Sequence, residues 1–107
     1  MGMLENLEAM LARGEDNKLL RFALGKACLE DGRPAEAAAH LSRCLAFDRE
    51  YSAAWKLCGK ALAACGHNQD AAKTFHQGIE VARRHGDKQA QKEMEVFLRR
   101  LEKQTGE

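Results

Sequence analysis

The amino-acid sequence predicts an all-α protein built from antiparallel helix-turn-helix repeats. Two observations support this prediction: the chain repeats its own pattern at an offset of 34 residues, and apolar residues recur every three or four positions within each period. At that offset Gly25 falls on Gly59 and Gly32 falls on Gly66. A fixed period of this length is typical of a stacked array, in which each unit buries its apolar face against its neighbours.

The first helix of each period is predicted from an apolar stripe. In the first period the helix covers residues 17–31, and its stripe comprises Leu20, Ala23, Leu24, Ala27 and Cys28. This spacing places the five side chains on one face of a helix. Asp16 or Asn17 is suited to cap the start of the helix, and Gly32 is suited to end it in a left-handed conformation. The equivalent helix of the next period covers residues 52–65.

The second helix of the first period begins at Pro34, whose fixed φ and missing N–H suit a first helical position. Its apolar positions are Ala37, Leu41, Cys44 and Leu45. The equivalent helix of the next period covers residues 68–84. Together the two helices form one hairpin in each period.

Two glycines fall inside the predicted first helices, at Gly25 and Gly59. Glycine in a helix interior lowers helix stability by roughly 1 kcal/mol relative to alanine. Its presence there indicates a place where two helices approach closely. We expect the small residues Ala37 and Ala71, at matching places on the second helices, to be the partners in that contact.

Both ends of the chain are predicted to be capping helices. Residues 3–13 resemble the second half of a preceding repeat, because the same offset aligns Leu7 with Leu41 and Leu11 with Leu45. After Gly86 the offset fails, but residues 87–104 retain helical spacing at Ala90, Met94, Phe97, Leu98 and Leu101. We expect this last helix, with Asp87 as N-cap, to cover the apolar face of the final repeat.

The second unit, residues 52–85, resembles a tetratricopeptide repeat. The family's aromatic, helix-contact glycine, turn glycine, small alanine and second aromatic match Trp55, Gly59, Gly66, Ala71 and Phe75. In the first unit, residues 18–51, the matching residues are Leu24, Gly25, Gly32, Ala37 and Leu41. The first unit departs from the pattern at Arg21, which stands where the aromatic is expected. Both units carry arginine, Arg49 and Arg83, in place of the usual proline.

This resemblance implies a single domain, residues 1–107, in which the first helix of each repeat lines a concave groove for peptide segments of other proteins. The groove-facing positions of the family map onto Leu19, Phe22, Lys26, Leu29, Glu30, Ala53, Lys56, Lys60, Ala63 and Ala64. Lys26, Lys56 and Lys60 would form a basic cluster beside an apolar strip. This arrangement suits an acidic, partly apolar peptide. The alternative is that the lysines only keep an alanine-rich face soluble.

The function predicted from these features is a protein–protein interaction module, a small monomeric adaptor of the cytoplasm. A second hypothesis is self-association through the terminal helices as a homodimer, for which Val96 is the discriminating residue because it lies off the apolar stripe. An enzyme or a metal protein is the third. No catalytic residue, metal ligand or cofactor is predicted.

The four cysteines admit three interpretations. Cys28, Cys44 and Cys58 lie on the apolar stripes, where unpaired cysteine acts as a small hydrophobic residue. A disulfide framework would require an oxidising compartment. A zinc site would draw on Cys58, Cys65 and His67, but the chain has no C-x-x-C pair. We favour the first interpretation.

Composition narrows the class of protein further. The formal net charge is +1, so nucleic-acid binding driven by charge is not expected. Glu5 and Glu8 interrupt any apolar run near the start, so we expect no signal peptide, and no stretch is apolar enough to predict a membrane span.

Overall fold

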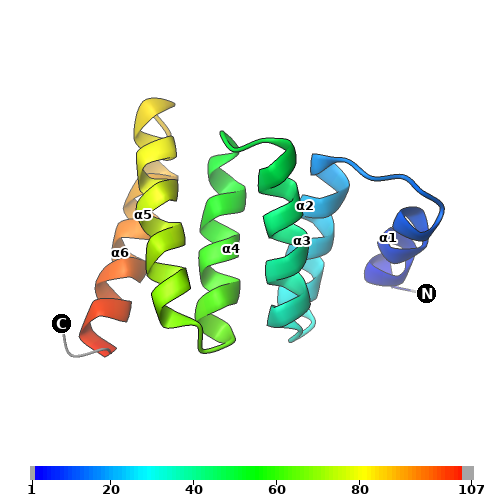
Figure 1. Ribbon diagram of the computed structural model, residues 1–107, viewed down its shortest axis with the longest axis horizontal. Helices are drawn as coiled ribbons and strands as arrows, with labels where there is room; N and C mark the ends of the chain where they lie inside the picture. Colours follow the sequence, from blue (N-terminus) through cyan, green and yellow to red (C-terminus); the bar gives the residue numbers. More distant parts are fainter. Residues whose placement is uncertain (1, 105–107) are drawn as a thin grey trace.

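The computed structural model describes residues 2–104 and folds them into helices, with no strand in this part of the chain (Figure 1). The helices are α1 (Met3–Ala12), α2 (Lys18–Glu30), α3 (Pro34–Phe47), α4 (Ser52–Ala64), α5 (Asn68–Arg84) and α6 (Lys88–Gln104). In Figure 1 they follow one another across the molecule, from α1 near the N-terminus to α6 at the opposite end. The predicted all-α repeat fold is confirmed.

Local capping residues set where the helices begin. The Asn17 side chain accepts a hydrogen bond from the Leu20 N–H at 2.8 Å, so Asn17, rather than Asp16, caps α2. Asp87 accepts a bond from the Ala90 N–H at 3.2 Å in the first turn of α6. These bonds satisfy backbone donors that a helix start leaves without a partner.

The hairpin turns depend on glycine. Gly32 and Gly66 have φ of 73° and 82°, a left-handed conformation that other residues rarely adopt. After Gly32 the Arg33 N–H donates to the Cys28 carbonyl at 2.9 Å, and a bond of the same kind follows Gly66. This pattern ends each first helix and reverses the chain into the second.

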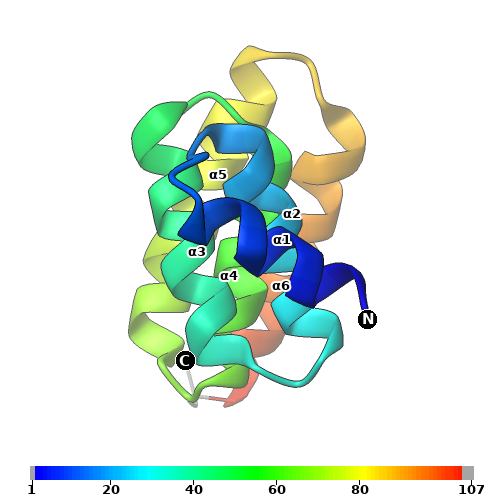
Figure 2. The ribbon, with the colours of Figure 1, turned by 90° about the vertical axis from the view of Figure 1, so that its right-hand side faces the viewer.

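The helices form two layers. Each helix from α2 to α5 packs against the next, and α2 also contacts α4, which in turn contacts α6. Within the described part of the chain α3 and α5 do not contact each other. The layer of α2, α4 and α6 is therefore the tighter, inner one, and α3 and α5 form the outer one (Figure 2).

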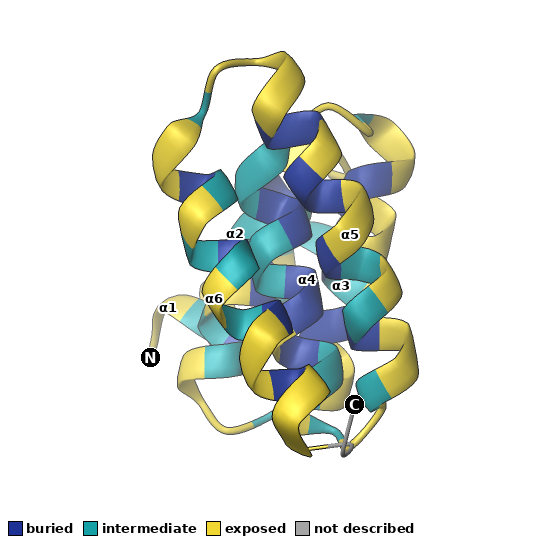
Figure 3. Cartoon of the chain, turned by 90° about the vertical axis from the view of Figure 1, so that its left-hand side faces the viewer, coloured by how far each residue is buried: buried dark blue, intermediate teal, exposed yellow. Residues whose placement is uncertain are grey.

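The buried side chains form one apolar cluster along the boundary between the layers. Its largest members include Leu41, Trp55, Phe75 and Met94. Viewed from the end formed by α5 and α6, buried residues lie between the helices while the outer surfaces are mostly exposed (Figure 3). The predicted burial of three cysteines in this cluster is confirmed, at Cys28, Cys44 and Cys58.

Close helix contacts occur at the predicted glycines but with different partners. A Cβ atom on Gly25 would overlap the Leu41 side chain, and one on Gly59 would overlap the ring of Phe75. In each hairpin a large side chain of the second helix therefore occupies the space that glycine leaves.

The prediction that Ala37 and Ala71 are these partners is wrong. Both alanines are fully buried, but they lie one helical turn before the residue that meets the glycine. The antiparallel register of the two helices determines which of their residues meet. The 34-residue offset gives no information about that register. A further close contact occurs at Gly78, where a Cβ would overlap Met94 and Trp55. The first unit has no glycine at this place, because Cys44 occupies it.

The terminal helices are buried to different extents. α1 contacts α2 alone and has no fully buried residue, although Leu7, Met10 and Leu11 are half-buried. α6 packs on both α5 and α4. It buries four apolar residues of its stripe, Ala90, Met94, Leu98 and Leu101.

Arg21 fills its half-buried position with ionic contacts. Its guanidinium donates to both carboxylate oxygens of Asp16, at 2.8 and 2.9 Å, and a third nitrogen lies 3.1 Å from Nδ1 of His40. The hydrogen bond from Arg21 lowers the pKa of Asp16. Burial, and next the charge of Arg21, lower the pKa of His40. The first repeat thus has a polar cluster where the second has tryptophan.

Candidate functional site

The inner face of the array, defined here as the exposed surface of α2, α4 and α6, contains the predicted groove positions (Figure 2). Residues 34 apart on α2 and α4 lie at equivalent levels because the two repeats share one period. Between α4 and α6 the spacing is 37 residues, as the contacts of Lys56 with Glu93 and of Lys60 with Phe97 show.

At the N-terminal ends of α2 and α4, aromatic and ionic contacts stabilise the inner face. The Phe22 ring stacks on Tyr51 with centroids 4.8 Å apart, so one face of Phe22 is covered by the protein itself. Lys18 forms an ion pair with Asp48 at 2.7 Å. Leu19 is 65% exposed and is the most accessible apolar groove residue at this end.

In the middle of the inner face the predicted lysine cluster is partly neutralised. Lys56 pairs with Glu93 of α6 at 3.3 Å, and its side chain is only 24% exposed. Lys26 is exposed and pairs with no carboxylate of residues 2–104. Of the three predicted lysines, Lys26 and Lys60 therefore carry free positive charge, whereas Lys56 joins α4 to α6.

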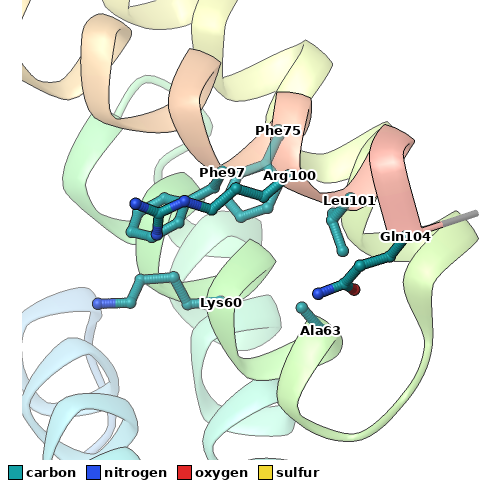
Figure 4. A pocket seen from close by; sticks show the side chains of 7 residues that line it. All are labelled: Lys60, Ala63, Phe75, Phe97, Arg100, Leu101 and Gln104. Carbon is teal, nitrogen blue, oxygen red and sulfur yellow. The ribbon is translucent and has the colours of Figure 1, made fainter.

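A pocket of about 270 Å³ opens between α4 and α6 at their C-terminal ends (Figure 4). We call it the α4–α6 pocket. The residues that line it are Lys60, Ala63, Phe75, Phe97, Arg100, Leu101 and Gln104. Phe75 and Leu101 are buried and form its apolar floor, whereas the side chains of Lys60, Arg100 and Gln104 are exposed at its rim.

The ring of Phe97 organises the rim of this pocket. It stacks on Phe75 with centroids 5.7 Å apart. Lys60 Nζ lies 5.2 Å, and the Arg100 guanidinium carbon 5.9 Å, from the centroid of the Phe97 ring. Such distances allow cation–π attraction, which holds both cations beside the opening. Neither cation pairs with a carboxylate in the described part of the chain.

Two predicted groove residues, Lys60 and Ala63, line this pocket, whereas Phe97 and Arg100 of α6 line it without having been predicted as groove residues. The 34-residue offset fails after Gly86, so it does not place α6 beside α4. A usable signal was the N-cap at Asp87, which marks the start of one further helix after α5 and so predicts another helix in the inner layer.

The cysteines do not form a reactive site. Burial raises the pKa of Cys44 to about 11, so this thiol is protonated at neutral pH. Residues 2–104 contain no group of three or more His, Cys, Asp or Glu side chains arranged to hold a metal ion. The alternative zinc ligands Cys58, Cys65 and His67 are therefore not assembled.

Fold and site define the class of protein: an α-helical repeat domain whose inner face combines free cations with accessible apolar side chains. No helix in residues 2–104 has both the length and the apolar character needed to cross a bilayer.

Comparison with known proteins agrees with this class. The sequence pattern of the family described as tetratricopeptide repeat matches residues 29–92. The TPR repeat-containing protein PA0015 of Pseudomonas aeruginosa is 54% identical over 101 residues, covering 94% of this chain and 96% of that protein. The chain belongs to the tetratricopeptide repeat family.

Solved structures show the same arrangement of helices. The solution structure of protein BPP2914 from Bordetella parapertussis has a TM-score of 0.84 and 45% sequence identity, and the match covers 97% of this chain and 90% of that one. A crystal structure of a tetratricopeptide repeat domain protein from Salinibacter ruber has a TM-score of 0.74 and 26% identity, over 81% of this chain and 97% of that one.

Proposed function

We propose that the protein is an interaction module that binds a peptide segment of a partner protein in the groove of its inner face. Membership of the tetratricopeptide repeat family supports an interaction role in general. The observation that carries the specific proposal is the pairing of free cations, Lys26 and Lys60, with an open apolar pocket on the same face. The peptide that suits this surface is acidic and partly apolar.

Apolar contact must supply much of the affinity. Exposed ion pairs contribute only about 0.2–1 kcal/mol each, whereas micromolar binding requires about 8 kcal/mol. Leu19, Leu29, Ala63 and Phe97 offer accessible apolar surface along the inner face. The cations then serve mainly to orient the peptide and to speed its association.

Binding rather than catalysis suits the chemistry of this face. The α4–α6 pocket is lined by lysine, arginine, glutamine and apolar residues, with no nucleophile beside a general base. We propose the cytoplasm as the location, because the four cysteines are unpaired and three of them are buried as thiols.

Self-association is the alternative function, and one observation bears on it. Val96 is 39% exposed on α6, but the adjacent Met94 is fully buried and Phe97 is half-buried in the pocket. On the other terminal helix, Met3 of α1 is 68% exposed. The exposed surface of these two side chains is far smaller than the roughly 800 Å² per partner of a stable interface. We therefore propose a monomer. Sedimentation at micromolar concentration tests this, and a dimer that Val96→Glu dissociates would support self-association instead.

The groove proposal is tested by capturing partners on the immobilised domain and identifying them by mass spectrometry. Three forms are compared: the parent protein, the groove variant Lys26→Glu with Lys60→Glu, and a control, Lys73→Glu with Arg99→Glu. The control makes the same charge change at exposed positions of α5 and α6 that neither line the pocket nor match a predicted groove position. A partner retained by the control and lost by the groove variant supports the proposal. A partner retained equally by all three binds elsewhere.

A further inference from the structure

Charge pairing on the inner face differs between its two ends. Towards the N-terminal ends of the inner helices, Lys18 pairs with Asp48 and Lys56 pairs with Glu93. Closer to the C-terminal ends of α4 and α6, Lys60 and Arg100 have no carboxylate partner within residues 2–104. The rim of the α4–α6 pocket therefore carries two positive charges that no described carboxylate neutralises.

The interior of the α4–α6 pocket is apolar. Phe75 is 1% exposed and Leu101 is 6% exposed, and Ala63 and the ring of Phe97 complete the wall. Its volume of about 270 Å³ lies at or below the small end of the range typical of small-molecule sites, about 300–1,000 Å³. A space of this size and polarity suits one large apolar side chain, whose burial is worth more than any contact at the rim.

The cations are held where a carboxylate beside that side chain would meet them. Phe97 places Lys60 and Arg100 around one ring. Arginine forms paired hydrogen bonds to a carboxylate, and lysine adds a point charge. The carboxylate stays at the rim because the pocket floor offers it no hydrogen-bond donor, and burying an unpaired charge is costly.

We propose that the α4–α6 pocket is the subsite that sets the specificity of the groove, and that it takes an apolar side chain followed by aspartate or glutamate within a peptide. We assign the acidic group to a side chain within the peptide, and an unblocked peptide that ends in phenylalanine tests a terminal carboxylate instead. This proposal rests on the proposed function, because it names the segment that the groove selects.

The test is an NMR titration of the ¹⁵N-labelled full chain with short peptides blocked at both ends. The probe peptide carries phenylalanine followed by glutamate between glycine and serine residues. Shift changes are expected around Lys60, Phe97 and Arg100. Glutamine in place of the glutamate should weaken binding about fivefold, through loss of two exposed ion pairs. Alanine in place of the phenylalanine should weaken it at least tenfold.

Neighbouring arginines supply a matched pair of variants. Arg100→Ala should weaken binding of the glutamate peptide about threefold and leave the glutamine peptide unchanged. Arg99→Ala changes the same charge on the same helix but does not line the pocket, so it should change neither affinity. Both residues are exposed, and the NMR spectra verify that each variant keeps the parent fold.

Several outcomes would overturn this assignment. Equal affinity for the glutamate and glutamine peptides would show that Lys60 and Arg100 do not select an acidic residue. Tighter binding of an unblocked peptide that ends in phenylalanine and lacks glutamate would favour a terminal carboxylate. Shift changes confined to α2 would place the peptide elsewhere in the groove, so the pocket would be wrong while the groove proposal survived. Absence of binding would also reject the pocket, and the capture experiment would decide the groove separately.

Discussion

The two helical hairpins share a backbone plan but differ in the side chains that hold them. In α4–α5, Trp55 is 5% exposed and its indole N–H donates to the Arg49 carbonyl at 2.8 Å. In α2–α3, the equivalent residue is Arg21, which bonds to Asp16 and approaches His40. The first hairpin therefore uses an ionic cluster where the second uses a buried aromatic.

The surroundings of the two hairpins explain this difference. The second hairpin lies between α3 and α6 and is covered on both sides, whereas α1 contacts only α2 of the first. Where helices cover both sides, a large aromatic side chain gains from complete burial. Where the cover is partial, an arginine can pack its stem and keep its charge near water. The repeat pattern tolerates either solution because the helix–turn–helix backbone is the same.

The largest expected effect is that of Trp55→Ala. Removing this buried side chain should lower the free energy of unfolding by about 3–5 kcal/mol, through lost burial and the cavity left behind. Urea denaturation followed by circular dichroism measures it, since Trp55 is the only tryptophan and fluorescence would be lost. A loss below about 1.5 kcal/mol would be inconsistent with a core role and would remove the contrast with Arg21.

Gly59→Ala tests the close contact within the second hairpin. In an open helix this change would stabilise by roughly 1 kcal/mol, but here the new methyl group overlaps the ring of Phe75. We expect a net destabilisation of about 1–3 kcal/mol from overpacking. Combining it with Phe75→Leu should give non-additive effects, with a coupling of at least about 0.5 kcal/mol. A stabilised single variant would show that the helices are not in close contact at Gly59.

Arg21→Ala should be less damaging than Trp55→Ala. Ion pairs at partly exposed positions contribute about 0–1 kcal/mol, so we expect the free energy of unfolding to fall by no more than about 1 kcal/mol. The difference between parent and variant should shrink in high salt, which screens the Asp16 interaction. Urea denaturation at low and high salt measures both effects. A loss as large as that of Trp55→Ala would mean that the two hairpins depend equally on this position.

The smallest expected effect is a pH dependence that belongs to the first hairpin. Burial and Arg21 lower the pKa of His40 in the folded state below its ordinary value of 6.5. The unfolded chain therefore binds more protons as the pH falls below 6.5, and the stabilising contribution is lost as the pH drops through the folded pKa. The free energy of unfolding should decrease from pH 7 to pH 5.

His40→Gln should flatten this decrease, and His76→Gln is the matched control because His76 is exposed on α5. Urea midpoints at pH 5, 6 and 7 measure the effect. An identical pH slope in the parent and His40→Gln would show that His40 does not titrate differently in the folded and unfolded states. The lowered pKa of Asp16 acts in the same direction at more acidic pH.

The fold follows from local signals in the sequence. The start of α3 at Pro34, the cap at Asn17 and the turns at Gly32 and Gly66 all act within a few residues of their position. Apolar spacing then determines which face of each helix is buried, and the 34-residue period shows that the hairpins stack. The resemblance to the tetratricopeptide repeat family used the two turn glycines together with Trp55, Gly59 and Phe75.

Only the tertiary structure decided which side chains meet across helices. The sequence placed Lys56 and Lys60 on one face, but packing of α6 pairs Lys56 with Glu93 and leaves Lys60 beside Phe97. Likewise, the register of the hairpin brings Gly59 against Phe75. Helix formation depends on neighbours along the chain, which repeat with a period. Contacts between helices depend on register and crossing geometry, which that period does not encode.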